Sequence, residues 1–129
     1  MKLRQAKSNL RAFYGISNDV PAYNSADVIL GIQFALSKAG ELNRPLVILL
    51  ALSTNLGGHD ASDPVEFYLG RLANAPGIAI VTAAGNETGY GKHYKGTLTE
   101  EDIVEFFVAE NESSVLLNIW GQDPDIFTL

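Results

Sequence analysis

Residues 77–87 read Gly-Ile-Ala-Ile-Val-Thr-Ala-Ala-Gly-Asn-Glu, and the organisation of the chain can be worked out from them. Residues 78–81 form a short apolar run rich in β-branched side chains, with Pro-Gly before it and Gly-Asn shortly after it. A run of this length between turn residues predicts a strand covered on both faces, as in a parallel sheet. The turn is therefore expected at the carboxyl end of a buried strand.

Two interpretations fit the turn at Gly85 and Asn86. Gly and Asn are the residues that most easily adopt positive φ, so the pair can be a tight turn without any chemistry. Alternatively, the turn lets the side-chain amide of Asn86 point into a crevice as a neutral hydrogen-bond donor, as an oxyanion hole requires. Ligands of open α/β sheets bind beyond the carboxyl ends of the strands. The spacing alone favours the simple turn.

A second apolar run, residues 46–52, also predicts a strand buried on both faces. A helix precedes it, because apolar residues recur at helical spacing after Asn24 or Ser25, either of which can cap the helix, and Gly40 is placed to end it. Between the strands, Asp-Pro-Val-Glu at residues 63–66 supplies a capping carboxylate and a first-turn proline for another helix. The order helix, strand, helix, strand predicts a parallel sheet with right-handed crossovers.

The remaining segments complete a prediction of two units. Residues 53–62 are polar and glycine-rich, which predicts a loop at the carboxyl end of the first strand. Residues 103–108 and 115–120 resemble strands joined by a short turn, so they should pair antiparallel, and residues 126–129 start a third strand. The sequence thus predicts a partial α/β domain over residues 1–101 and a β-rich unit over residues 102–129.

The composition excludes several classes of function. The 129-residue chain is 47% hydrophobic, as in a globular domain with its own core, and its net charge of −6 makes nucleic acid a poor partner. The longest apolar run is far below the roughly 18 residues of a membrane helix, so we expect a soluble protein without a membrane partner. There is no cysteine. The early cations Lys2, Arg4, Lys7 and Arg11 are interpreted as one solvated face.

Taken together, these features resemble an internal piece of a subtilisin-like serine peptidase, a subtilase of family S8. Residues 47–53, Val-Ile-Leu-Leu-Ala-Leu-Ser, resemble the substrate-flanking strand, and residues 80–87, Ile-Val-Thr-Ala-Ala-Gly-Asn-Glu, resemble the oxyanion strand. Three further stretches are similar to the bacterial subgroup that includes the germination peptidases of spore formers: residues 7–14, 43–48 and 54–60. That subgroup carries a jelly-roll-like insertion between the oxyanion asparagine and the catalytic serine. Residues 102–129 resemble its beginning.

The resemblance implies a division of roles within one site. Asn86 would donate its side-chain amide to the oxyanion of the tetrahedral intermediate. Six residues would form the substrate-binding walls, on the first strand Ala51, Leu52 and Ser53 and on the second Ala83, Ala84 and Gly85. The resemblance implies a polypeptide substrate, the rest of the parent peptidase chain as partner, and no cofactor. It also implies a bacterial protein that is secreted or associated with spores.

The catalytic triad of that family is not found in this sequence. The only Gly-Thr pair is followed by Leu98 instead of Ser, and neither His59 nor His93 stands in the His-Gly-Thr setting of the family's base. No Asp has the context of the orienting carboxylate. The chain is therefore expected to be inactive alone, because nucleophile, base and oxyanion donor act as a unit. Ala51 and Ser53 also replace the usual Ser and Gly, which affects the pairing with a substrate backbone.

Two functions fit these observations. The first is a fragment of a serine endopeptidase whose missing segments lie on either side, and the alternative is a non-catalytic pseudopeptidase or peptide-binding module on the same scaffold. A metal site at His59, Asp60 and Asp63 is not expected, because zinc needs three or four well-placed ligands. His93 is expected to pack near the turn at Asn86. Trp120 and Phe106 are interpreted as the core of the β-rich unit.

Overall fold

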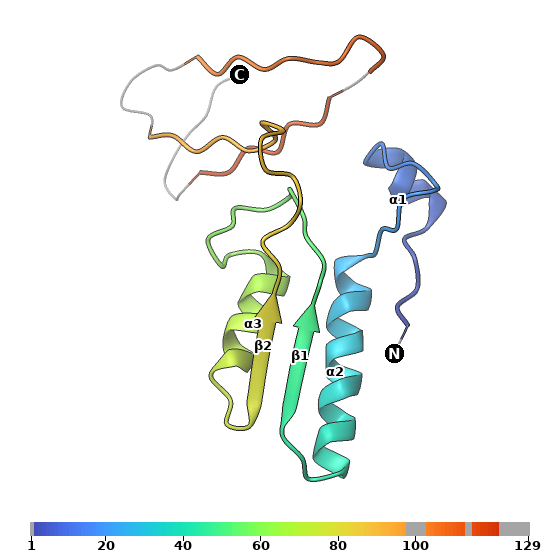
Figure 1. Cartoon of the computed structure of the whole chain (residues 1–129), viewed down its shortest axis with the longest axis vertical. Coiled ribbons are helices and arrows are strands. Elements are labelled where there is room, and N and C mark those ends of the chain that lie inside the picture. Colours follow the sequence, from blue (N-terminus) through green and yellow to red (C-terminus); the bar gives the residue numbers. More distant parts are fainter. Residues whose placement is uncertain (1, 98–102, 113–114, 122–129) are drawn as a thin grey trace.

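The computed structural model of the chain describes residues 2–97, 103–112 and 115–121. These parts contain three helices and two strands, in the order α1 (Ser8–Phe13), α2 (Ser25–Glu41), β1 (Leu46–Leu50), α3 (Pro64–Ala73) and β2 (Ile78–Thr82) (Figure 1). The strands pair in parallel, and their register runs from Leu46 opposite Ile78 to Leu50 opposite Thr82. The predicted parallel α/β arrangement is confirmed. Within the described residues, no helix is long and apolar enough to cross a membrane.

Side chains cap both long helices at their N-termini. Asn24 Oδ1 accepts a hydrogen bond from the amide of Ala26 at 2.8 Å, and Asp63 Oδ1 accepts one from the amide of Val65 at the same distance. Pro64 occupies the first helical position of α3, where the amide hydrogen that it lacks has no helical partner. Caps of this kind stabilise a helix by about 1 kcal/mol. The two predicted helix starts are therefore confirmed.

The C-terminus of α2 differs from the prediction that Gly40 ends the helix. The helix continues through Gly40, and Asn43 adopts the left-handed conformation with φ of 49°. The amide of Asn43 donates to the carbonyl of Gly40 at 3.0 Å, and the amide of Arg44 donates to the carbonyl of Ala39 at 3.0 Å. These two bonds form a Schellman motif in which Asn43 has the position that glycine usually takes.

The sheet is covered on one face, so the prediction that both strands are buried on both faces is wrong. Ile48 is buried, whereas its neighbours Val47 and Leu49 are 69% and 68% exposed. Helix α2 contacts β1, α3 contacts β2 and the two helices contact each other, which places them on the same face. Val47, Leu49, Ala79 and Val81 form the other, exposed face, which we call the open sheet face. The apolar runs are typical of strands that are covered on both faces, but the helices in the described residues cover only one face of this sheet.

Arg11 is buried, although the sequence placed it on a solvated face. Its side chain is the centre of a hydrogen-bond network and the residue is 5% exposed. The guanidinium donates to the carbonyl oxygens of Ala6, Ser17 and Val20 at 3.1, 2.8 and 2.8 Å, and to Gln5 Oε1 at 2.8 Å. Arg11 thereby ties α1 to the loop that leads into α2. This region, residues 2–14, had no predicted secondary structure.

Replacing Arg11 by Met is expected to destabilise the chain by about 3 kcal/mol, because three backbone carbonyls lose a charged donor. The matched control is Arg4→Met. Arg4 makes an exposed ion pair with Asp27 at 3.2 Å, which contributes less than about 1 kcal/mol. Chemical denaturation of dilute protein, followed by circular dichroism, measures both losses. Equal losses in the two variants would contradict the role of Arg11.

The predicted antiparallel pairing beyond residue 102 is not present in the described residues. Residues 103–112 and 115–121 form no strand, and their apolar side chains are exposed, with Phe107 99% exposed. Phe106 and Trp120 are about half exposed, so the prediction that they form a core is wrong. A two-stranded hairpin is marginal without a further layer to pack against, which explains the difference.

One other expectation cannot be compared with the structure. The predicted third strand, residues 126–129, lies outside the described residues.

Candidate functional site

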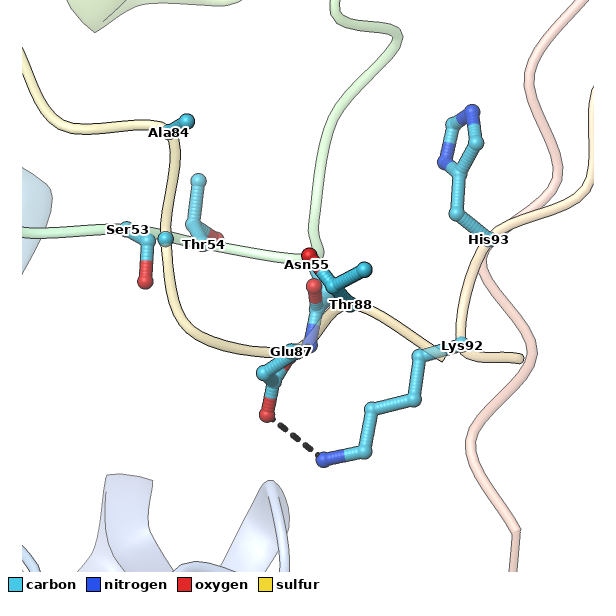
Figure 2. Close-up of a pocket in the computed structure, with 9 residues that line it drawn as sticks. Ser53, Thr54, Asn55, Ala84, Glu87, Thr88, Lys92 and His93 are labelled. Carbon is cyan, nitrogen blue, oxygen red and sulfur yellow. Dashed lines mark hydrogen bonds and ion pairs between the residues drawn. The ribbon is translucent and has the colours of Figure 1, made fainter. Parts of the chain in front are cut away.

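A pocket of about 240 Å³ lies where both strands end (Figure 2). Because β1 and β2 are parallel, the loops that follow them leave the sheet at the same edge, where ligands of such sheets bind. One loop supplies residues 53–55 and the other supplies residues between 84 and 93. The lining side chains and glycine are Ser53, Thr54, Asn55, Ala84, Gly85, Glu87, Thr88, Lys92 and His93.

Three of the predicted wall residues line this pocket. Ser53 comes from the first loop, and Ala84 and Gly85 come from the second. A Cβ atom placed on Gly85 would lie 3.5 Å from Ser53 Cβ, so the two walls are in direct contact at this point. The other predicted wall residues, Ala51, Leu52 and Ala83, precede the lining residues along the chain and do not line the pocket.

Asn86 follows the turn that the sequence predicted. Gly85 has φ of 86°, a conformation that favours glycine, and it reverses the backbone directly after the wall. Asn86 is exposed and stands between two residues that line the pocket, Gly85 and Glu87, although it is not itself a lining residue. In the described part of the chain, its side-chain amide has no hydrogen-bond partner.

A charged network that the sequence did not predict joins the two walls. Lys92 Nζ lies 2.7 Å from Glu87 Oε1, and Asn55 Nδ2 donates to Glu87 Oε2 at 2.5 Å (Figure 2). The hydrogen bond from Lys92, and then the one from Asn55, hold the pKa of the Glu87 carboxyl below its usual value. Adjacency of Glu87 to Asn86 was the only signal for this network in the sequence. Its partners lie on different loops and follow no local periodicity.

Replacing Lys92 by Met is expected to raise the pKa of Glu87 towards its usual value, since the first of its two donors is lost. The folded-state pKa is lowered, so the network contributes stability above the unfolded-chain pKa of about 4.3 and loses it as the pH falls through the folded value. An NMR titration of the Glu87 side-chain carboxyl measures the shift. Lys92→Arg keeps a donor and should leave the titration near that of the wild type. An identical midpoint in the Met variant would exclude this contact.

Gly85→Ala and Gly89→Ala form a matched pair, because both glycines have φ of 86°. Each substitution is expected to cost about 1–2 kcal/mol for a left-handed alanine. The Cβ of Ala at 85 would make an ordinary contact with Ser53, and at 89 it would meet no atom within 4 Å. Equal losses in denaturation experiments are therefore expected. A much larger loss for Gly85→Ala would show that the two walls are closer than described.

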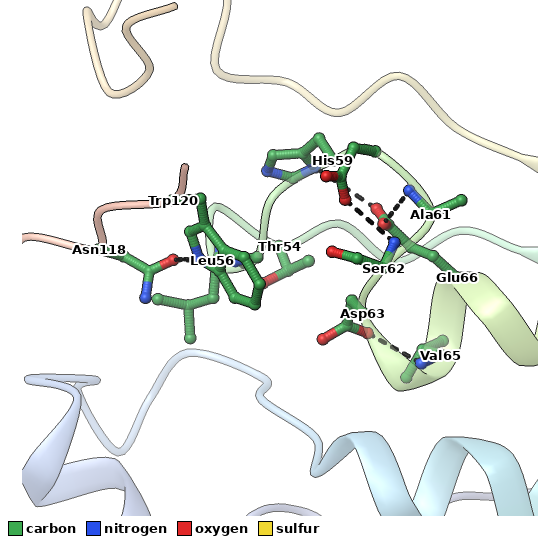
Figure 3. A network of polar contacts seen from close by, with 12 residues as sticks. Thr54, Leu56, His59, Ala61, Ser62, Asp63, Val65, Glu66, Asn118 and Trp120 are labelled. Carbon is green, nitrogen blue, oxygen red and sulfur yellow. Dashed lines mark hydrogen bonds and ion pairs between the residues drawn. The ribbon is translucent and has the colours of Figure 1, made fainter. Parts of the chain in front are cut away.

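The loop between β1 and α3 forms a second polar network beside the pocket (Figure 3). Glu66 Oε2 accepts the amide of Ala61 at 3.0 Å, and Glu66 Oε1 lies 3.7 Å from His59 Nδ1. Glu66 therefore binds the loop before the helix. The ring of His59 meets the ring of His93 edge-on at 5.5 Å. His93 lines the same pocket as Gly85 and Glu87, which places it near the turn as expected. Among the described residues, no group of three or more His, Cys, Asp or Glu is arranged to hold a metal ion.

Comparison with solved structures finds a likeness to a protease. The chain is similar to the Clostridium perfringens CspB protease, with 37% sequence identity and a TM-score of 0.53. The likeness covers 57% of this chain and 16% of that protease, so the matched part is a small share of a much longer protein. No protein-family model matches the sequence, and no curated protein sequence matches it either. Over just more than half of its length, the chain is therefore similar in sequence and structure to a segment of a protease.

Proposed function

We propose that this chain is a segment of a subtilisin-like serine endopeptidase that carries the oxyanion-hole donor and part of the substrate-binding wall. One observation carries the proposal: Asn86 follows a left-handed glycine at the carboxyl end of a parallel strand, beside a pocket whose opposite wall begins at Ser53. The likeness to a protease at 37% identity supports the same interpretation. A Gly-Asn turn without chemistry explains neither the pocket nor that likeness.

The chemistry proposed for Asn86 needs only a neutral donor. When a serine attacks a peptide carbonyl, the carbonyl oxygen becomes an oxyanion, and the Asn86 side-chain amide would donate a hydrogen bond to it. A donor placed in advance stabilises the transition state more than the ground state, because the charge develops only during the attack. The substrate backbone would run beside Ala51, Leu52 and Ser53. Ala83, Ala84 and Gly85 would form the other wall, where small residues leave room for a substrate side chain.

The proposal assigns the nucleophile, the base and the orienting carboxylate to other segments of the parent protein. The sequence of this chain has no Gly-Thr-Ser and no His-Gly-Thr. The chain alone would therefore bind substrate backbone without cleaving it. Residues 1–101 would belong to the peptidase domain and residues 102–129 to the start of an inserted β-rich subdomain, whose strands would form only when the insertion is complete. Secretion or association with spores is part of the same proposal.

The experiment that tests this proposal is to read the genomic sequence on both sides of the segment. Asp and His-Gly-Thr motifs encoded upstream, with Gly-Thr-Ser encoded downstream, would support a peptidase segment. Substituted triad positions, or stop codons directly beside the segment, would contradict it and favour the alternative, a pseudopeptidase or peptide-binding module.

A further inference from the structure

The segment 115–121 is attached to the loop after β1 through the side chain of Asn118 (Figure 3). Asn118 Oδ1 accepts a hydrogen bond from the backbone amide of Gly57 at 3.1 Å, and these residues are 61 positions apart. The same oxygen accepts a hydrogen bond from Trp120 Nε1. One side-chain oxygen thus joins a distant segment to the loop that carries the pocket wall.

The chemistry of the donors fixes the orientation of this side chain. A backbone amide and an indole N–H can only donate, so the oxygen of Asn118, and not its NH₂ group, must face both Gly57 and Trp120. The oxygen has two lone pairs, and the two donors occupy both. An aspartate at this position keeps these acceptors. A leucine of similar size removes them.

Apart from the contacts of His59 and Ala61 with Glu66 and of His59 with His93, the loop that Asn118 holds has few other restraints. Beyond the last strand pair, Leu50 with Thr82, residues 51–62 make no backbone–backbone hydrogen bond to another described residue. Their contacts within the loop are local, such as the amide of Leu56 donating to Thr54 Oγ1 at 3.0 Å. Gly57 has φ of 102°, so the backbone reverses where Asn118 binds.

Among the described residues, two long-range hydrogen bonds therefore hold the first wall. One is the bond from Asn55 to Glu87 within the pocket, and the other is the bond from Gly57 to Asn118 outside it. Ser53, Thr54 and Asn55 line the pocket immediately before Gly57. Loss of the outer bond leaves the wall held by Asn55 at its inner end and, further along the loop, by the contacts of His59 and Ala61 with Glu66 and of His59 with His93.

We propose that Asn118 is a positioning residue of the candidate site, which docks the segment 115–121 on the loop after β1 and holds the wall of Ser53, Thr54 and Asn55 in place. The identity of the ligand that this wall would contact, an extended polypeptide, depends on the proposed function. The docking itself does not. Through this contact, a segment remote in sequence determines how rigid one side of the pocket is.

The test compares Asn118→Leu and Asn118→Asp with the wild-type chain by residue-resolved hydrogen exchange at micromolar concentration. Loss of a hydrogen bond of about 1 kcal/mol is expected to raise the exchange rate of the Gly57 amide roughly fivefold or more in Asn118→Leu. The amide of Leu56, which donates to Thr54 Oγ1, should exchange faster as well. Asn118→Asp keeps the acceptor and should exchange like the wild type. Asn111→Leu, which replaces an exposed asparagine in the segment 103–112, is the matched control and should change nothing.

Two further readouts separate positioning from general loss of structure. Trp120 is the only tryptophan, so its emission should shift to longer wavelength in Asn118→Leu, while the helical circular dichroism stays unchanged. In the same variant the pKa of Glu87 should rise, because a looser wall weakens the bond from Asn55. Equal Gly57 exchange in the wild type and Asn118→Leu would overturn the inference and leave the proposed function intact. If the Gly57 amide exchanges faster in Asn118→Leu but the parent protein lacks the peptidase motifs, the docking inference stands and only the proposed function is overturned.

Discussion

In the complete peptidase that we propose, Asn86→Ala is expected to lower kcat by about two to three decades and to leave KM for a peptide substrate nearly unchanged. This magnitude is the one known for the oxyanion-hole asparagine of subtilisin, and we adopt it from there. The physical reason is that the amide meets a charged oxygen only in the transition state. Substrate binding in the ground state then changes little.

The structure supplies the control for this experiment. Asn18 lies in the loop before α2, is exposed, and stands far from Asn86 in the sequence. Asn18→Ala should therefore leave both kinetic constants unchanged. Steady-state kinetics with a fluorogenic peptide measures both variants against the wild type. A change confined to KM in Asn86→Ala would contradict an oxyanion role, because it would mean that Asn86 binds substrate and transition state equally.

The isolated chain is expected to self-associate through the open sheet face, since three of its side chains, Val47, Leu49 and Val81, are 69%, 68% and 49% exposed. Burying the remaining area of one such side chain contributes about 1–2 kcal/mol. Replacing all three by Thr keeps the β propensity and removes about 3–6 kcal/mol, so the association constant should fall by roughly two to four decades.

Analytical ultracentrifugation over a range of concentrations measures this association. The matched control is Phe107→Thr, which removes a side chain that is 99% exposed but lies outside the sheet. It should change the association much less than the triple replacement, because it removes one apolar side chain where the triple replacement removes three. A wild-type chain that stays monomeric at all concentrations would contradict the prediction.

The sequence predicts the parallel core well because the signals for it are local. The Asn24 and Asp63 caps and the two apolar runs each determine the structure of their own few residues. The helix end at Asn43 and the buried Arg11 were missed, since each depends on carbonyl groups that folding brings to it. Charge alone marks Arg11 as a surface residue.

The candidate site also has a part that the sequence predicts and a part that it does not. The turn at Gly85, and the meeting of the two loops at one edge, follow from strand ends that parallel pairing must bring together. Ser53 and Ala84 were assigned as wall residues from the family resemblance. The contacts of Glu87 with Lys92 and of Gly57 with Asn118 join loops of irregular conformation. Their geometry is set by glycines and by side-chain hydrogen bonds, which leave no period in the sequence.

Labelling with a fluorophosphonate, which reacts with activated serines, tests most directly whether the pocket beside Asn86 is one part of a serine peptidase site. The complete reading frame is expected to be labelled at a serine outside residues 1–129 and to hydrolyse a fluorogenic peptide. The 129-residue chain is expected to remain unlabelled. Labelling of the chain on one of its own serines, or a complete protein with intact peptidase motifs that neither reacts nor cleaves, would contradict the proposed division of the site.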